Sequence, residues 1–301
     1  MTTRMFRVMR MRKTLSGLVM LTGLIVLLAP GTAISARVPA AAQRIVSVIP
    51  AVTEMLFAMG AGDAVVGVSS YDHYPAAVES RTRVGGLIDP NFERIVTLKP
   101  DLVIVYGTQQ EFIAKLEQAH VPIYRYEHAA LADVTATVRA IGQRIGRADA
   151  GNALAGAMER DLDAVRRQVA GDRRLKTLLL FGRDKSSLRS INASGGYGFL
   201  HDLLDVAGGD DVFADVKKQS VQTNAEQVLA RAPEAIIELH ESITPAEMTQ
   251  ARSLWSVLGT VPAVRNGRVH FLTGEYLTIP GPRVAQAARA IAEALHPSVR
   301  K

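Results

Sequence analysis

Short apolar runs of strand length alternate along this chain with longer segments in which apolar residues recur at helical spacing. Turn residues such as Pro50 and Gly60 separate the two kinds of segment. This alternation predicts a parallel, doubly wound α/β fold, because parallel strands need a crossover helix between them. The expected strands are Arg44–Ile49, Val65–Val68, Leu102–Val105, Val121–Tyr126, Leu175–Phe181, Ala235–Leu239 and Arg268–Leu272.

The helical segments are bounded by residues that favour helix starts and stops. We expect Thr53 to be the N-cap of the first helix and Gly60 to end it. The chain also contains a loop rich in glycine and proline at Gly274–Arg283, just before its last helix. The expected helices are Glu54–Met59, Glu111–Ala119, Leu131–Ile145, Phe199–Val206 and Val284–Leu295.

A much longer helix is predicted from about Ala148 to Ala170. The segment contains no proline, and its apolar residues from Leu154 to Val169 recur at helical spacing. The opposite face is charged, which is typical of a solvated side. Because this helix lies between two similar halves of the sequence, we interpret it as their connector.

The two halves are similar because a short stretch occurs twice, at Glu93–Ile104 and at Glu226–Ile237. A constant offset of 133 residues pairs glutamate with glutamate and proline with proline. Each copy predicts a short helix opened by an acid, ended by proline and followed by a buried strand. A second pair of similar segments, Gly60–Val65 and Ala207–Val212, precedes the repeated stretch in both halves. Repetition of this kind indicates two similar lobes.

The domain prediction therefore has four parts. Residues 1–36 are expected to form a secretory signal peptide, because a basic segment precedes an apolar run and then small residues. A membrane anchor is the alternative, although the run contains polar and glycine residues and is short for a spanning helix. The remaining parts are an N-terminal lobe at 44–147, the connecting helix at 148–171 and a C-terminal lobe at 172–297.

The net charge of the chain is much smaller without the expected signal peptide, which we call the leader. The whole sequence has 35 basic and 29 acidic residues, and five of the basic residues lie in the leader. The remaining balance of 30 to 29 gives no support for nucleic-acid binding. The absence of cysteine excludes disulfides, thiolate metal sites and lipid attachment to a cysteine. We expect an exported, soluble, monomeric protein of a bacterial periplasm.

Enzyme motifs are mostly missing. The sequence contains no phosphate-binding loop of the GxxxxGK[ST] type and no HExxH, and Gly196–Gly198 lacks the third glycine of a dinucleotide fingerprint. Asn192–Gly196 does not match a GxSxG nucleophile elbow. This stretch is either a structural turn before a helix or a helix N-terminus that holds an anionic ligand group.

The carboxyl ends of the expected strands are the predicted ligand-binding positions, as in other doubly wound folds. Three tyrosines, Tyr71, Tyr106 and Tyr276, lie at these ends and are either ordinary loop aromatics or the faces of a cleft for a flat ligand. His73 and His240 are either surface histidines or axial ligands of a metal chelate. Clustered histidine and acid ligands at a spacing suited to a bare metal ion are not found.

Several motifs occur together along the chain, namely Arg44–Pro50 with Thr53-Glu54, Val66–Ser69, Tyr74-Pro75, Glu93–Leu102, Glu226–Pro233 and Pro280–Arg283. Together they resemble the periplasmic substrate-binding proteins of vitamin B12, iron–siderophore and haem importers. The resemblance runs from about Arg44 to Pro297 and is strongest to the cobalamin binders of that family.

This resemblance implies two α/β lobes joined by one long helix, with the ligand between the lobes. It also implies that Glu93 and Glu226, one on each lobe, dock onto arginines of an inner-membrane ABC permease. Tyr71 and Tyr106 match positions where the cobalamin binders place aromatic residues, and Glu275-Tyr276 match an acid–aromatic pair. Together with His240, these are the expected ligand-binding residues.

Two further positions differ from that pattern, since Leu87 and Ser220 stand where the cobalamin binders have tryptophan. The expectation is a periplasmic receptor without a cofactor of its own that captures a corrinoid-like metal chelate. A siderophore or haem receptor is the alternative, with Tyr71, His73 or His240 as iron ligand. A third hypothesis is an exported chelate-processing hydrolase that uses His240 and Glu275.

Overall fold

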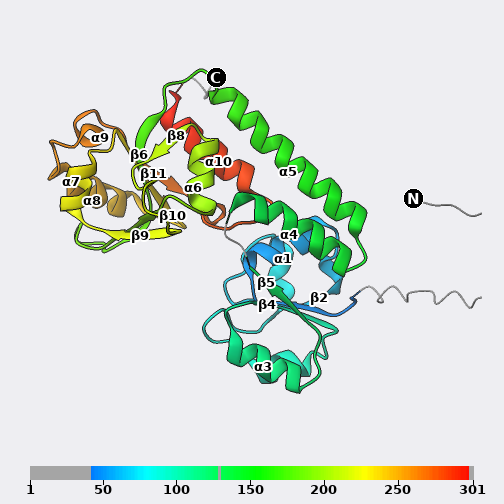
Figure 1. The fold of residues 1–301 in the computed structure, drawn as a ribbon. Helices are drawn as coiled ribbons and strands as arrows, with labels where there is room; N and C mark the ends of the chain where they lie inside the picture. The colour runs from blue at the N-terminus through cyan, green and yellow to red at the C-terminus, as the bar shows by residue number, and fades with distance from the viewer. Residues whose placement is uncertain (1–41, 128–129, 298–301) are drawn as a thin grey trace, which may run out of the picture. The chain divides into compact units, whose positions relative to one another are not determined.

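A computed structural model describes residues 42–127 and 130–297. The expected signal peptide at 1–36 lies outside the described residues. The described chain folds around two β-sheets with helices against them (Figure 1). None of its helices in those two ranges combines the length and apolar character needed to span a membrane.

The first sheet is entirely parallel, and its strand order is β3-β2-β1-β4-β5. The order reverses between β1 and β4, so this sheet is doubly wound as predicted. Its strands are β1 Ile45–Ser47, β2 Val65–Val68, β3 Thr82–Arg83, β4 Leu102–Tyr106 and β5 Ile123–Tyr126. The helical segments between them are α1 Pro50–Ala58, η1 Gly62–Ala64, η2 Ala76–Ser80, α2 Phe92–Thr97 and α3 Gln110–Gln118.

The second sheet is mixed, with strand order β11-β10-β6-β7-β9 and β8 paired to β6. The prediction of parallel pairing fails at β7 and β9, which run antiparallel to their neighbours. The short loop between β6 and β7 is the reason, because it leaves no room for a crossover helix. The strands are β6 Leu175–Arg183, β7 Ile191–Ser194, β8 Gly209–Asp211, β9 Ser220–Thr223, β10 Ala235–His240 and β11 Val269–Thr273. The helical segments are α6 Phe199–Val206, α7 Ala225–Arg231, α8 Pro245–Ser256, α9 Pro262–Arg265, η3 Glu275–Leu277 and α10 Val284–Leu295.

The long helix α5, Ala148–Val169, forms where the sequence predicts the connector. It packs against α4, Leu131–Arg144, and against α10 (Figure 1). Gly142 and Gly151 face one another where α4 and α5 approach most closely, since a Cβ on either would meet the backbone of the other helix at 3.0 Å. One continuous apolar core extends from the first sheet through these helices to one face of the second sheet. A smaller core that includes Trp255 covers the other face.

In both copies of the repeated stretch, the helix begins with the same kind of N-cap and ends in the same backbone conformation. Asn91 and Asn224 are the N-caps of α2 and α7, and each side chain accepts a hydrogen bond from a backbone N–H of the first turn. Both helices end at a residue in the left-handed region, Lys99 and Ala232, each with φ of 48°. The proline that follows each of these residues accounts for the ending, because it disfavours helical backbone at the preceding residue.

The acid after each proline holds the start of the neighbouring strand. Asp101 accepts hydrogen bonds from the backbone N–H groups of Gln43 at 2.8 Å and Arg44 at 3.0 Å. Glu234 accepts one from Lys176 N–H at 3.1 Å. The two copies therefore share a structural role, which joins the start of β4 to the start of β1 and the start of β10 to the start of β6.

One detail of the first helix differs from the prediction. Helix α1 begins at Pro50, and its N-cap position is Ile49 instead of Thr53. Thr53 is fully buried, and its hydroxyl donates to the Ile49 carbonyl at 3.2 Å. Proline stabilises the first turn here, because its fixed φ suits a helix start and its missing N–H has no partner to lose.

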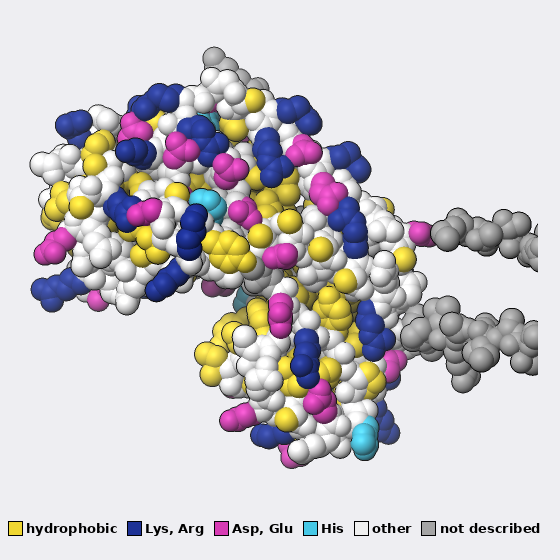
Figure 2. All heavy atoms as spheres, in the orientation of Figure 1, with side chains coloured by type: hydrophobic (Ala, Val, Ile, Leu, Met, Phe, Trp, Pro, Cys, Tyr) yellow, Lys and Arg dark blue, Asp and Glu magenta, His cyan; other side chains and the backbone are white. Residues whose placement is uncertain are grey.

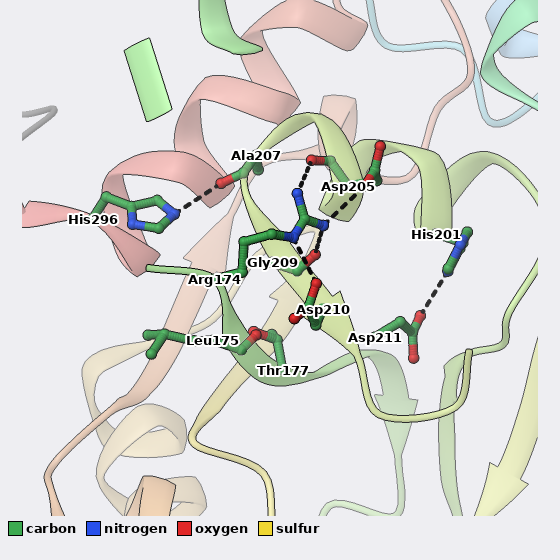
Figure 3. A network of polar contacts seen from close by, with 10 residues as sticks. All are labelled: Arg174, Leu175, Thr177, His201, Asp205, Ala207, Gly209, Asp210, Asp211 and His296. Carbon is green, nitrogen blue, oxygen red and sulfur yellow. Dashed lines mark hydrogen bonds and ion pairs between the residues drawn. The ribbon is translucent and has the colours of Figure 1, made fainter. Parts of the chain in front are cut away.

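A polar network fixes the position of β8 and α6 (Figure 3). The Arg174 guanidinium donates to Asp210 at 2.6 Å, to Asp205 at 2.8 Å and to the Gly209 carbonyl. His296, at the end of α10, lies 3.2 Å from the Ala207 carbonyl. The network ties the end of the described chain to the second lobe.

Replacing Asn91 or Asn224 with alanine should lower the free energy of unfolding by about 1 kcal/mol each, because a helix N-terminal N–H loses its partner. Asn152 is the control, since it is exposed inside α5 and caps nothing. Asn152→Ala should instead be neutral or slightly stabilising, because alanine is the better helix former. Urea unfolding of the three variants measures the difference, and equal effects at all three positions would contradict the capping role.

Candidate ligand site at the strand ends

Tyr71 follows β2 and presents an exposed ring at the edge of the first sheet. The side chain is 64% exposed, and the ring lies over Gly86, where any Cβ would collide with it. The neighbouring Gly85 has φ of +86°, a conformation that glycine adopts without penalty. The two glycines therefore shape the loop before α2 around the tyrosine.

Tyr106 ends β4 and is half-buried. Its ring meets Tyr126 edge-on at a centroid distance of 5.6 Å. Its backbone N–H donates to Gln109 at 2.9 Å, and the Gln109 amide donates to the Leu87 carbonyl at 2.8 Å. These two hydrogen bonds connect the end of β4 to Leu87, in the loop whose Gly86 lies against the Tyr71 ring. Burial raises the pKa of the Tyr106 hydroxyl, and the nearby Asp72 carboxyl raises it further.

Asp72 is a member of this site that the sequence analysis missed, although it stands between Tyr71 and His73. Its side chain is buried, with Oδ2 accepting from Ser69 N–H at 2.7 Å. Oδ1 has no hydrogen-bond partner among the described residues. Burial raises the pKa of Asp72 to about 7, with Glu54 raising it further, while hydrogen bonds from Thr53 and Ser69 and the charge of Arg83 oppose the shift.

The other residues of this loop are exposed. His73 projects from the surface, and Tyr74 is 45% exposed. Two more apolar side chains are exposed in the loop before α2, Leu87 at 44% and Ile88 at 94%. The end of the first sheet thus presents several apolar surfaces to solvent, which is characteristic of binding sites.

His240 ends β10 and lies above a buried ion pair. Its Nε2 is 3.0 Å from Oε1 of Glu238 but is not aligned for a hydrogen bond to it. Glu238 pairs with Arg183 at 3.0 Å and accepts from the Trp255 indole N–H at 2.8 Å. Arg183, Glu238 and His240 line a pocket of about 220 Å³ at the ends of β6 and β10. Lys185 and Glu247, which are paired at 2.9 Å, also line it.

Glu275 and Tyr276 form the short helix η3 after β11. Gly274 precedes them with φ of +146°, and a Cβ there would collide with the Tyr276 ring. Glu275 lies 3.6 Å from Arg283. The Arg283 guanidinium also lies over the Tyr276 ring at 5.7 Å and over the Tyr74 ring of the first lobe at 4.0 Å.

The structure therefore brings the predicted residues together only in part. Tyr71 and Tyr106 lie at the end of the first sheet, and His240, Glu275 and Tyr276 at the end of the second. Arg283, which the sequence analysis named only within a motif, connects the two ends through Tyr74 and Glu54.

Glu93 and Glu226 occupy equivalent positions in the first turns of α2 and α7, and both side chains are exposed. Neither carboxylate has an ion-pair partner within the described chain. Over the face drawn in Figure 2, basic and acidic side chains are interspersed.

Of the two residues of the hydrolase hypothesis, Glu275 lies 3.6 Å from Arg283, and His240 lies 3.0 Å from Glu238 without a hydrogen bond to it. In residues 42–127 and 130–297, no group of three or more His, Asp or Glu side chains is placed to hold a metal ion. What the site offers is aromatic surface and paired charges, which suit binding.

Asp72→Asn should reduce the pH dependence of stability between about pH 4 and 7. In the unfolded chain Asp72 ionises near its usual pKa of 3.8, whereas the folded protein keeps it protonated up to about pH 7. Stability is therefore lost as the pH rises through this window, by a few kcal/mol at most, and the loss levels off above it. Thermal unfolding at pH 5 and pH 8 should show that the variant gains more over the parent at pH 8 than at pH 5, and equal differences at both values would exclude the shift.

Comparisons with known proteins agree with a binding role. A family model described as periplasmic binding protein matches residues 45–276. The vitamin B12-binding protein of Vibrio cholerae is 29% identical over 255 residues, which covers 84% of this chain and 89% of that protein. The Salmonella typhimurium protein of the same name is 29% identical over 257 residues, with coverages of 85% and 91%.

Solved structures give the same result. The periplasmic vitamin B12-binding protein of Vibrio cholerae has a TM-score of 0.73 and 26% identity, covering 87% of this chain and 100% of that chain. A periplasmic haem-binding protein from Roseiflexus has a TM-score of 0.72 at 24% identity, covering 85% and 99%, and so shares the fold. The resemblance inferred from the sequence is confirmed, with two α/β lobes joined by one long helix and a family of binding proteins instead of enzymes. This chain belongs to the periplasmic binding protein family.

Proposed function

We propose that this protein captures a corrinoid of the cobalamin type in the periplasm and delivers it to an ABC importer. The observation that carries the proposal is the 29% identity to vitamin B12-binding proteins over 84% of the chain. The proposed ligand-binding residues are Tyr71, Tyr106, His240, Glu275 and Tyr276, at the ends of the two sheets.

The exposed apolar surface at the end of the first sheet supports a large, flat ligand. Tyr71, Tyr74 and Ile88 are 64%, 45% and 94% exposed, so a ligand that covered them would remove apolar area from water. Leu87, which replaces a tryptophan of the cobalamin binders, is also exposed and apolar. It contributes contact area without an aromatic face.

The pairing of cations at the strand ends supports a ligand with neutral side groups. Arg183 is paired with Glu238, Lys185 with Glu247, and Arg283 with Glu54. A carboxylate-bearing ligand such as haem would have to compete with these acids for the same cations. The amide side groups of a corrinoid need no free cation and can use both donors and acceptors of such pairs.

The exposed acids Glu93 and Glu226 are proposed to dock onto the permease. Each is fixed to a helix whose N-cap is an asparagine side chain, so the two charges have a defined separation. A single exposed ion pair contributes little, but two at fixed positions orient one protein on another. The domain boundaries predicted above assign one of these acids to each lobe.

Export with removal of the leader near residue 36 is part of the same proposal, as is a monomeric, unlipidated product. The family and the names of the relatives support a periplasmic location. The N-terminal sequence and mass of protein purified from the periplasm test the cleavage.

Cyanocobalamin titrated into the purified protein should bind with submicromolar affinity, about −8 kcal/mol or better. Tyr71→Ala should weaken binding about tenfold, because a flat contact is lost. Val257→Ala is the control, since Val257 is 74% exposed but follows α8, away from the strand ends. Hemin and a ferric siderophore, titrated in parallel, should bind at least tenfold more weakly. If hemin or the siderophore bound more tightly than cyanocobalamin, the corrinoid assignment would be wrong and that compound would be the ligand.

The double variant Glu93→Ala with Glu226→Ala should keep its affinity for cyanocobalamin but lose uptake in cells that depend on this protein. Asp63→Ala with Asp161→Ala removes the same charge from exposed positions on η1 and α5 and should leave uptake intact. Cobalamin-dependent growth and accumulation of labelled cyanocobalamin measure the outcome. Normal uptake by the first double variant would rule out the docking role.

A further inference from the structure

Arg283 is the residue through which the ends of the two sheets contact each other. It stands at the start of α10 in the second lobe, and its Nε donates to Oε2 of Glu54 at 2.9 Å. Its Nη2 donates to Oε1 of the same carboxylate, so the contact is bidentate. Glu54 belongs to α1 of the first lobe, 229 positions earlier in the chain.

The same guanidinium contacts two tyrosine rings. Its Cζ lies 4.0 Å from the centroid of Tyr74, which comes from the first lobe, and 5.7 Å from that of Tyr276, which comes from the second. Glu275 is 3.6 Å away on the second lobe. We refer to Arg283, Glu54, Tyr74, Glu275 and Tyr276 as the interlobe cluster.

Burial makes this contact costly to break. Only 3% of the Glu54 side chain and 16% of the Arg283 side chain are exposed. Desolvation raises the pKa of Glu54, and the hydrogen bonds and charge of Arg283 oppose that shift. A partial separation that broke this contact without admitting water would leave a buried carboxylate without its partner, which is strongly disfavoured.

The loop before Arg283 is shaped to bring it there. The Cβ position of Gly281 is 3.4 Å from Glu54 Oε2 and 3.5 Å from the Ala51 carbonyl, so the loop is in van der Waals contact with α1. Pro280 and Pro282 on either side restrict the backbone. The Gly- and Pro-rich loop noted in the sequence thus positions one arginine against the opposite lobe.

We propose that Arg283 is a positioning residue for ligand binding, which holds the two strand ends at a fixed separation in the absence of ligand. Tyr74 and Tyr276 are then in place before the ligand arrives. The free-energy cost of ordering these two side chains is therefore not subtracted from the binding free energy. The ligand part of this inference rests on the proposed corrinoid function, and the positioning part does not.

The test measures the separation of the lobes directly. Because the chain has no cysteine, Gln118→Cys on α3 and Ala246→Cys on α8 accept spin labels at exposed positions, one in each lobe. Arg283→Lys keeps the charge but loses the bidentate contact. Glu54→Gln with Arg283→Gln removes both charges together, so that no buried charge is left unpaired. Each is introduced into the doubly labelled protein and compared with the parent by pulsed electron spin resonance.

A matched control has the same chemistry within a single lobe. Arg231 donates to Asp215 in a bidentate contact at 2.6 and 3.0 Å and lies over the Phe213 ring at 5.0 Å. Arg231→Lys should therefore leave both the interlobe distance and ligand binding unchanged.

Both interlobe variants should broaden the distance distribution without ligand and weaken cyanocobalamin binding about tenfold, mainly through slower association. Unchanged distributions in both variants would overturn the proposal, and so would broader distributions with unaltered affinity and association rate. If the parent protein fails to bind cyanocobalamin, the corrinoid assignment is wrong. The distance measurement then still decides whether Arg283 holds the lobes.

Discussion

Glu54 and Arg283 come from different lobes and meet where water is largely excluded, so neither charge is stable without the other. Burial of such a pair contributes little net stability, but it disfavours every arrangement in which the partners are apart. The Glu54–Arg283 pair therefore determines how the two lobes are placed more than how stable they are. It holds Tyr74 of the first lobe 4.0 Å and Tyr276 of the second lobe 5.7 Å from the guanidinium, and it joins the start of α10 to α1. The continuous core through α4, α5 and α10 supports the same arrangement from the side of the long helix.

The repeated stretch shows how a duplicated sequence gives two equivalent surfaces. In each copy an asparagine caps the helix, a left-handed residue ends it, and an acid after the proline binds the neighbouring strand. The exposed glutamates are the residues of this unit that have no role inside it. A left-handed conformation costs roughly 1 kcal/mol for a residue other than glycine, and both Lys99 and Ala232 retain it. This equivalence is consistent with selection on the direction of α2 and α7, which the docking proposal requires.

Most of the fold could be predicted because local pattern and tertiary structure agree. The connector was found from its apolar spacing, and the limits of α6 and α10 match the predicted ones. The antiparallel strands β7 and β9 could not be predicted, since both are short and neither contains an apolar run. The positions of Tyr71 and Tyr106 at strand ends follow from the sequence, whereas the contact of Arg283 with Glu54 spans 229 positions. Asp72 lay among the named residues, but only burial distinguishes it from an ordinary loop acid.

The charges of the site bear on how a ligand could be both held and released. Arg183, Lys185 and Arg283 are already neutralised by acids of the protein, so a bound ligand is not needed to compensate them. Affinity then depends on contact with the exposed aromatic and apolar surfaces, which falls quickly as surfaces separate. Under the proposed function, a permease that held Glu93 and Glu226 could release the ligand by a small change in lobe separation. That change acts against the Glu54–Arg283 contact, so the same ion pair that forms the site in the free protein also determines how much work its opening requires.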